Sequence, residues 1–148
     1  MKALITLFLS IFMIFSCYAQ QKSSDVNNLE GLWQLKFMKA NSASDSLAVK
    51  APIFKHIRSD LGFTNLSLTD IHLIGTLEGS LEISDTGILT EKIAKQGPSI
   101  GSNMIGQTLK IPYLLTNGNN QLYLTFYSAD QNGTPLEYQE IYERVHIR

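Results

Sequence analysis

Short segments in which apolar and polar residues alternate follow one another along most of the chain. In residues 77–83 apolar residues and glycine alternate with glutamate and serine, and in residues 121–127 Leu122, Leu124 and Phe126 share one face. A period of two is typical of a sheet with one apolar and one polar side. The pattern predicts eight strands, at residues 31–38, 52–59, 62–68, 74–84, 86–95, 105–116, 120–128 and 135–147.

The segments between these strands are rich in residues that tolerate tight turns, such as Asn117-Gly118-Asn119-Asn120. Turn signals at intervals of about 8–12 residues favour a sandwich or a barrel over alternating strands and helices. The best helical segment, Ser44–Val49, would form at most about two turns. Since short connections between sequential strands favour a meander, and closure leaves no exposed edge, we expect an all-β, eight-stranded antiparallel up-and-down barrel.

The first 19 residues have the layout of a secretory signal peptide. Lys2 precedes an apolar run from Ala3 to Phe15, which is shorter than the roughly 20 residues of a membrane-crossing helix. We expect cleavage after Ala19, a polar leader at residues 20–28, one domain at residues 29–148, and a periplasmic or extracellular location. Cleavage before Cys17 would instead leave a lipid-anchored protein.

Composition excludes several classes of site. Cys17 is the only cysteine, so a chain cleaved after Ala19 has no disulfide scaffold and no cysteine metal cage. The net charge is −1 and the basic residues are scattered, which argues against nucleic-acid binding. His56, His72 and His146 lie in separate segments without metal-ligand spacing, so we expect no metal and no cofactor.

Both ends of the domain resemble lipocalins and the related calycins. The residues are Gly31-Leu32-Trp33 in the first strand and Arg144 in the last. In those families the tryptophan plugs the closed end of the barrel and a basic residue lies across its ring, an arrangement that gains about 0.5–2 kcal/mol. The resemblance implies that Gly31, Trp33 and Arg144 close a lipocalin-like barrel whose first and last strands are neighbours.

More narrowly, the chain is similar to a lipocalin-like family of unknown function found in secreted bacterial proteins. The matching segments are residues 29–35, 81–83, 89–93 and 138–145, in that order along the chain. This chain has Tyr142 where the family pattern has tryptophan, and its strand at residues 62–68 is shorter than usual.

Two glutamates are the strongest polar candidates for contact with a ligand. Glu91 shares a strand face with Leu89 and Ile93, and Glu140 shares one with Tyr138, Tyr142 and Arg144. A carboxylate inside a barrel must be paired, hydrogen-bonded or protonated. Arg144 cannot pair directly with Glu140, because four residues along a strand span about 13 Å. The glutamates therefore either contact a polar ligand group, join a network of tyrosine hydroxyls, or face solvent.

We expect a small, mainly apolar or amphipathic ligand inside the barrel, in a pocket opening opposite Trp33. The residues expected to contact it are Glu91, Tyr113, Leu124, Phe126, Tyr138, Glu140 and Tyr142. One alternative is a barrel filled by its own side chains that acts as a protein-interaction module. A second is an enzyme that uses Glu91 or Glu140 for proton transfer. Because no nucleophile or cofactor motif accompanies these glutamates, we expect no catalytic residues and a protein that is not an enzyme.

Overall fold

A computed structural model describes residues 28–40, 47–70, 72–129, 133 and 135–146. The signal peptide predicted at residues 1–19 and almost all of the predicted leader lie outside these residues. The strands are β1 (Gly31–Ala40), β2 (Leu47–Ala48), β3 (Ile53–Ile57), β4 (Gly62–Leu68), β5 (Leu73–Ile83), β6 (Ile88–Gln96), β7 (Thr108–Thr116), β8 (Gln121–Ala129) and β9 (Pro135–Arg144).

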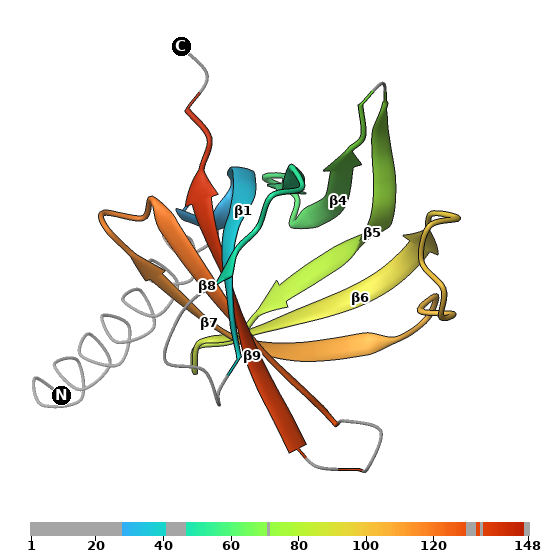
Figure 1. Cartoon of the computed structure of the whole chain (residues 1–148). Helices are drawn as coiled ribbons and strands as arrows, with labels where there is room; N and C mark the ends of the chain where they lie inside the picture. The colour runs from blue at the N-terminus through green and yellow to red at the C-terminus, as the bar shows by residue number, and fades with distance from the viewer. Residues whose placement is uncertain (1–27, 41–46, 71, 130–132, 134, 147–148) are drawn as a thin grey trace, which may run out of the picture.

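Eight of these strands form a closed ring (Figure 1). Each strand from β3 to β8 pairs with the next one antiparallel, and β1 pairs with both β3 and β9. The predicted all-β, eight-stranded antiparallel up-and-down barrel is therefore confirmed. The short segment Gly62–Leu68 takes full part in the wall, because it pairs with β3 on one side and β5 on the other.

The best helical candidate, Ser44–Val49, is not helical at residues 47–49, the part of it that the structure describes. Leu47 and Ala48 form β2, which pairs with Met38 and Phe37 of β1. The backbone N–H of Val49 continues this ladder by donating to the carbonyl of Lys36 at 2.8 Å. An isolated helix of two turns is marginal, whereas the protruding end of β1 offers backbone partners to an extended segment.

Burial of the inward-facing side chains falls from one end of the barrel to the other. On β3, Ile57 is fully buried while Ile53 is partly exposed. On β8, Leu122 is fully buried, Phe126 is partly exposed and Ser128 is exposed. The barrel is therefore closed at the end that contains Trp33 and open to solvent at the opposite end.

Trp33 and Arg144 form the floor of the closed end. They are direct partners in the β1–β9 ladder, and the guanidinium carbon of Arg144 lies 4.1 Å from the indole centroid. Trp33 is fully buried and donates its Nε1–H to the carbonyl of Leu29 at 2.8 Å. The predicted contact between the first and last strands is confirmed.

Arg144 also binds three backbone carbonyls from two separate parts of the chain. Its guanidinium donates to the carbonyls of Asn28, Glu30 and Asn119. Gly31 makes room for it, since a Cβ at that position would lie 2.6 Å from Arg144 Nη1. Its φ of +140° is also one that other residues rarely adopt. Glycine is thus required at position 31 because a side chain there would collide with the guanidinium of Arg144.

Candidate functional site

All seven residues predicted to contact a ligand lie on the inner wall of the barrel. Cross-strand partners in an antiparallel ladder point to the same side of the sheet. Glu140 is opposite the fully buried Leu124, and Phe126 is opposite Tyr138 with its ring stacked at 5.1 Å. The inner positions are Glu91 on β6, Tyr113 on β7, Leu124 and Phe126 on β8, and Tyr138, Glu140 and Tyr142 on β9.

The seven residues differ in how much of their surface remains accessible. Glu91 and Tyr142 are almost fully buried, and Leu124 is fully buried, beneath other side chains. Tyr113, Phe126, Tyr138 and Glu140 each keep some exposed surface. The first three side chains are therefore shielded from solvent, whereas the other four keep surface that a bound molecule could contact.

Glu91 is neutralised by a lysine from the facing part of the barrel. Lys55 on β3 places its Nζ 2.6 Å from Glu91 Oε1, and the two side chains are only 2% and 3% exposed. The ammonium also lies 4.7 Å from the centroid of the Phe63 ring. This buried ion pair is the principal polar contact of the interior.

Lys55 was not among the residues singled out from the sequence. Its position in β3 carried a signal, because Lys55 alternates in phase with Ile53 and Ile57, which also point inward. A lysine between two inward isoleucines requires a buried anionic partner. The partner is 36 residues away, and only the closed barrel brings the two together.

Glu140 has a hydroxyl partner and no ammonium or guanidinium partner among the described ion pairs. Tyr142 donates its hydroxyl hydrogen to Glu140 Oε2 at 2.7 Å. The pKa of Glu140 is raised above its ordinary value, mainly because the carboxyl is buried. The Tyr142 hydrogen bond and the charge of Lys55 lower this pKa, and the charge of Glu91 raises it. Burial, followed by the charge of Glu140, raises the pKa values of both Tyr138 and Tyr142, so both hydroxyls stay protonated.

Asn65 adds an unsatisfied acceptor to the same interior. It is the partner of Lys55 in the β3–β4 ladder. Its Oδ1 is the one buried side-chain nitrogen or oxygen in the described residues without a hydrogen-bond partner. Its backbone carbonyl accepts the Thr76 hydroxyl at 3.2 Å. A buried acceptor without a donor costs about 1–3 kcal/mol, so the site lacks a donor at this position.

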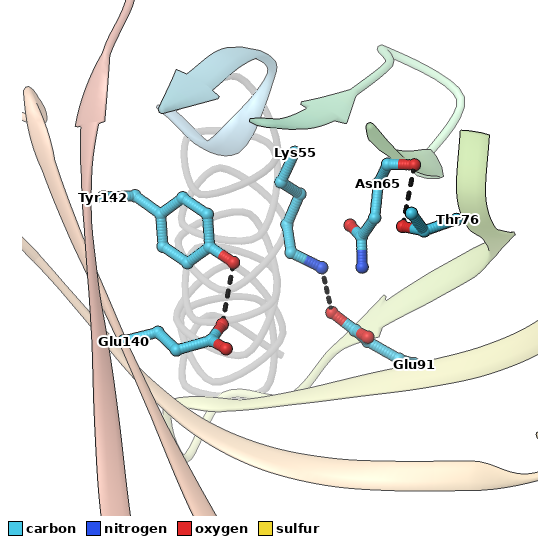
Figure 2. Close-up of polar contacts among 6 residues, drawn as sticks. All are labelled: Lys55, Asn65, Thr76, Glu91, Glu140 and Tyr142. Atoms are coloured by element: carbon cyan, nitrogen blue, oxygen red, sulfur yellow. Dashed lines mark hydrogen bonds and ion pairs between the residues drawn. The ribbon is translucent and has the colours of Figure 1, made fainter. Parts of the chain in front are cut away.

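The polar groups converge from several strands into one interior region. Figure 2 shows Lys55, Asn65, Glu91 and Glu140 extending toward a common space from β3, β4, β6 and β9. The region holds one ammonium and two carboxylates. Within the described ranges, no group of three or more histidine, cysteine, aspartate or glutamate side chains is arranged to hold a metal ion. The arrangement suits the binding of a polar group that brings hydrogen donors.

A hollow lies between β5 and β6, away from the seven candidates. Its volume is about 330 Å³ and it is lined by residues 75–78 and 95–97. The register of the ladders shifts on both sides of this part of β5. The exposed pair formed by Glu78 and Lys95, 3.0 Å apart, stands at its edge. None of the residues predicted to contact a ligand lines this hollow.

Comparison with known proteins identifies the family of the chain. The profile of a family described as "Domain of unknown function (DUF4488)" matches residues 28–148. The chain belongs to this family. The matched residues form a closed eight-stranded antiparallel barrel in which Arg144 lies across Trp33. The chain therefore has the lipocalin-like fold that the sequence resemblance implied.

Solved structures give a further comparison. A protein titled "Odorant Binding Protein OBP1" aligns with 82% of this chain and 75% of its own, at a TM-score of 0.44 and 8% sequence identity. No curated protein matches the chain. In the part of the chain that the structure describes, no helix is long and apolar enough to cross a membrane.

The raised pKa of Glu140 predicts how stability changes with pH. The folded protein holds this proton more tightly than the unfolded chain, so the contribution of Glu140 to stability is full at low pH and is lost as pH rises through its folded pKa. We expect Glu140→Gln, which stays neutral and still accepts the Tyr142 hydrogen, to be more stable than the wild type at about pH 8, with a smaller difference near pH 4. Urea unfolding at both pH values measures this.

Glu143→Gln is the matched control for that comparison. Glu143 lies on the same strand, on the other face, where it pairs in the ladders with Gln34 and Gln121. This variant removes the same charge without changing the interior. An equal gain in stability from Glu143→Gln, or a gain from Glu140→Gln that does not grow with pH, would contradict the assignment to Glu140.

Proposed function

We propose that this protein binds a small, mainly apolar or amphipathic ligand inside the barrel, and that the ligand enters at the end opposite Trp33. The observation that carries the proposal is the fall in burial along the inner wall, from a sealed floor to partly exposed aromatic side chains. Tyr113, Phe126, Tyr138 and Glu140 would contact the ligand directly. Glu91, Leu124 and Tyr142 would support the site from beneath.

The expected binding energy is sufficient without a diagnostic motif. Covering roughly 250 Å² of apolar ligand surface at about 25 cal/mol/Å² gains about 6 kcal/mol. Losses of translational and rotational freedom reduce this gain, which leaves a modest affinity. A binding role is favoured over proton transfer by Glu91, because Lys55 already holds that carboxylate at 2.6 Å.

Thermal unfolding in the presence of candidate ligands tests the proposal. The protein is first unfolded and refolded to remove any molecule retained from the cell. A ligand present at a hundred times its Kd should then stabilise the protein by about 2.7 kcal/mol, seen as a higher Tm. The panel comprises long-chain alcohols, alkylamines, fatty acids, sterols, haem and aromatic metabolites.

Two variants of β8 locate the site. Phe126→Ala shortens an inward ring and is expected to weaken binding, whereas Tyr127→Ala shortens an outward ring that is 66% exposed and is expected to leave binding unchanged. If no compound in the panel raises the Tm of the folded wild type, the binding proposal fails. The filled-barrel interaction module would then be preferred.

We also propose that the protein is exported to the periplasm or the cell exterior and that residues 1–19 are removed. The basic residue, apolar run and small-residue boundary of that segment support this. Mass spectrometry of the exported protein should find Gln20 at its N-terminus. A chain that begins at a fatty-acid-labelled Cys17 would show the lipid-anchored form instead, and a chain that keeps residues 1–19 would contradict export by this route.

A further inference from the structure

We propose that Glu140 recognises a protonated amine, so that the ligand is an amphipathic amine with its ammonium group at Glu140 and its apolar part directed toward the open end. This inference rests on the proposed function and specifies the ligand class. Three features of the interior support it: an unneutralised carboxylate, aromatic rings beside it, and a shortage of hydrogen donors.

The first feature is the absence of a cation at Glu140. The nearest basic candidate, Lys55, places its Nζ 2.6 Å from Glu91 Oε1 and is committed to that carboxylate. None of the four ion pairs among the described residues includes Glu140. With Lys55 and Glu91 cancelling each other, an ionised Glu140 leaves the polar region above the Trp33–Arg144 floor with one net negative charge. A monocation is the ligand that neutralises it.

The second feature is the surroundings of the carboxylate. Glu140 keeps part of its surface exposed, and Tyr138 precedes it by two residues on the same inner face of β9. The Tyr138 ring stacks on Phe126, with an angle of 12° between their planes. Aromatic faces attract ammonium groups, and their apolar surface also covers a hydrocarbon chain. Carboxylate and rings together match a molecule with a charged head and an apolar body.

The third feature is the balance of donors and acceptors. The one donor observed at Glu140 is the Tyr142 hydroxyl, which donates to Oε2. Asn65 Oδ1, on the facing part of the wall, lacks a donor altogether. An ammonium group brings three donors and no acceptor. A carboxylate ligand would bring acceptors to a region already rich in them and would be repelled by an ionised Glu140.

The charge of Glu140 makes the proposed binding depend on pH. The ionisable groups that face the same interior are Tyr138 and Tyr142 on its own strand, Tyr113 on β7, Lys55 on β3 and Glu91 on β6. The raised pKa values of Tyr138 and Tyr142 keep both hydroxyls neutral, so on this face of β9 Glu140 is the group whose ionisation changes. Amine affinity should fall as the pH drops through the pKa of Glu140, by at most about tenfold per pH unit.

Three compounds with one hydrocarbon chain test the inference: octylamine, octanol and octanoate. Their Kd values are measured by calorimetry at about pH 8, where Glu140 is expected to be ionised and octylamine is cationic. A charge-assisted contact predicts that octylamine binds about tenfold to a hundredfold more tightly than octanol, and octanoate more weakly than either. Glu140→Gln should bring octylamine down to the affinity of octanol and remove the pH dependence, while Glu143→Gln changes neither.

The outcomes separate this inference from the proposed function. If octanol and octylamine bind equally, or octanoate binds more tightly, the amine inference is overturned while ligand binding stands. If none of the three raises the Tm or gives a calorimetric signal, but other members of the panel bind, the amine inference is overturned and the proposed ligand binding stands. If nothing in the panel binds, both proposals fail. Unchanged octanol affinity in Glu140→Gln shows that the variant is folded and its apolar site intact.

Discussion

Replacing Lys55 with methionine is expected to lower the free energy of unfolding by about 3–5 kcal/mol near neutral pH. Methionine keeps most of the apolar stem but removes the ammonium, so Glu91 remains as an uncompensated charge in a nearly inaccessible site. Urea unfolding followed by circular dichroism measures the loss.

Two further variants test the cause of that loss. Lys92→Met removes a lysine whose ion pair with Glu82 is at least half exposed on both sides, and such pairs contribute at most about 1 kcal/mol. The double variant Lys55→Met/Glu91→Met replaces both buried charges with apolar groups and should recover most of the stability lost in the single variant. A single variant as stable as the wild type would show that Lys55 and Glu91 are not paired in the folded protein.

Trp33→Ala is expected to cost about 3–5 kcal/mol, the usual range for deleting a large buried aromatic side chain. The indole is fully buried, and its removal leaves a cavity at the floor of the barrel. The carbonyl of Leu29 loses its donor and the guanidinium of Arg144 loses the ring beneath it. Because Trp33 is the only tryptophan, unfolding of this variant must be followed by far-ultraviolet circular dichroism rather than by tryptophan fluorescence.

Trp33→Phe separates the components of this effect. Phenylalanine keeps an aromatic face under Arg144 but cannot donate to the Leu29 carbonyl, so we expect a smaller loss, of about 1–3 kcal/mol. If Trp33→Ala were within about 1 kcal/mol of the wild type, the indole would not be the structural floor of the barrel.

The interior polar groups link stability with the proposed binding. Ionised Glu140 is held in a site whose burial disfavours its charge, which lowers the stability of the unliganded protein as pH rises. A cationic ligand would relieve this unfavourable state. Glu140→Gln should therefore do two opposite things at once: stabilise the free protein and abolish the preference for amines. Such a trade between stability and activity is expected where a group is retained for binding.

Several elements followed from the sequence because they depend on local chemistry. Alternation with a period of two defined the eight strands of the barrel, and turn residues such as Asn117, with a φ of 53°, marked where the chain reverses. The same alternation put Glu91 in phase with Leu89, which also lies inside. For Glu140, alternation left open which face of the last strand points inward, and the pairing of Glu140 with the buried Leu124 decided it. The resemblance to lipocalins, carried by the Gly31-x-Trp33 motif and Arg144, implied the closure of the barrel, and the contact between Trp33 and Arg144 confirms it.

Only the tertiary structure decided which inward groups meet. The ladder registers and their bulges determine that Lys55 pairs with Glu91 across 36 residues, which leaves Glu140 with the hydroxyl of Tyr142 on its own strand and without a cation. The pairing of Leu47–Ala48 with Phe37 and Met38 likewise depends on the end of β1, and the residue pattern at 44–49 did not predict it. Alternation specifies the face on which a side chain lies, whereas the contacts between distant strands are set by the closure of the barrel as a whole.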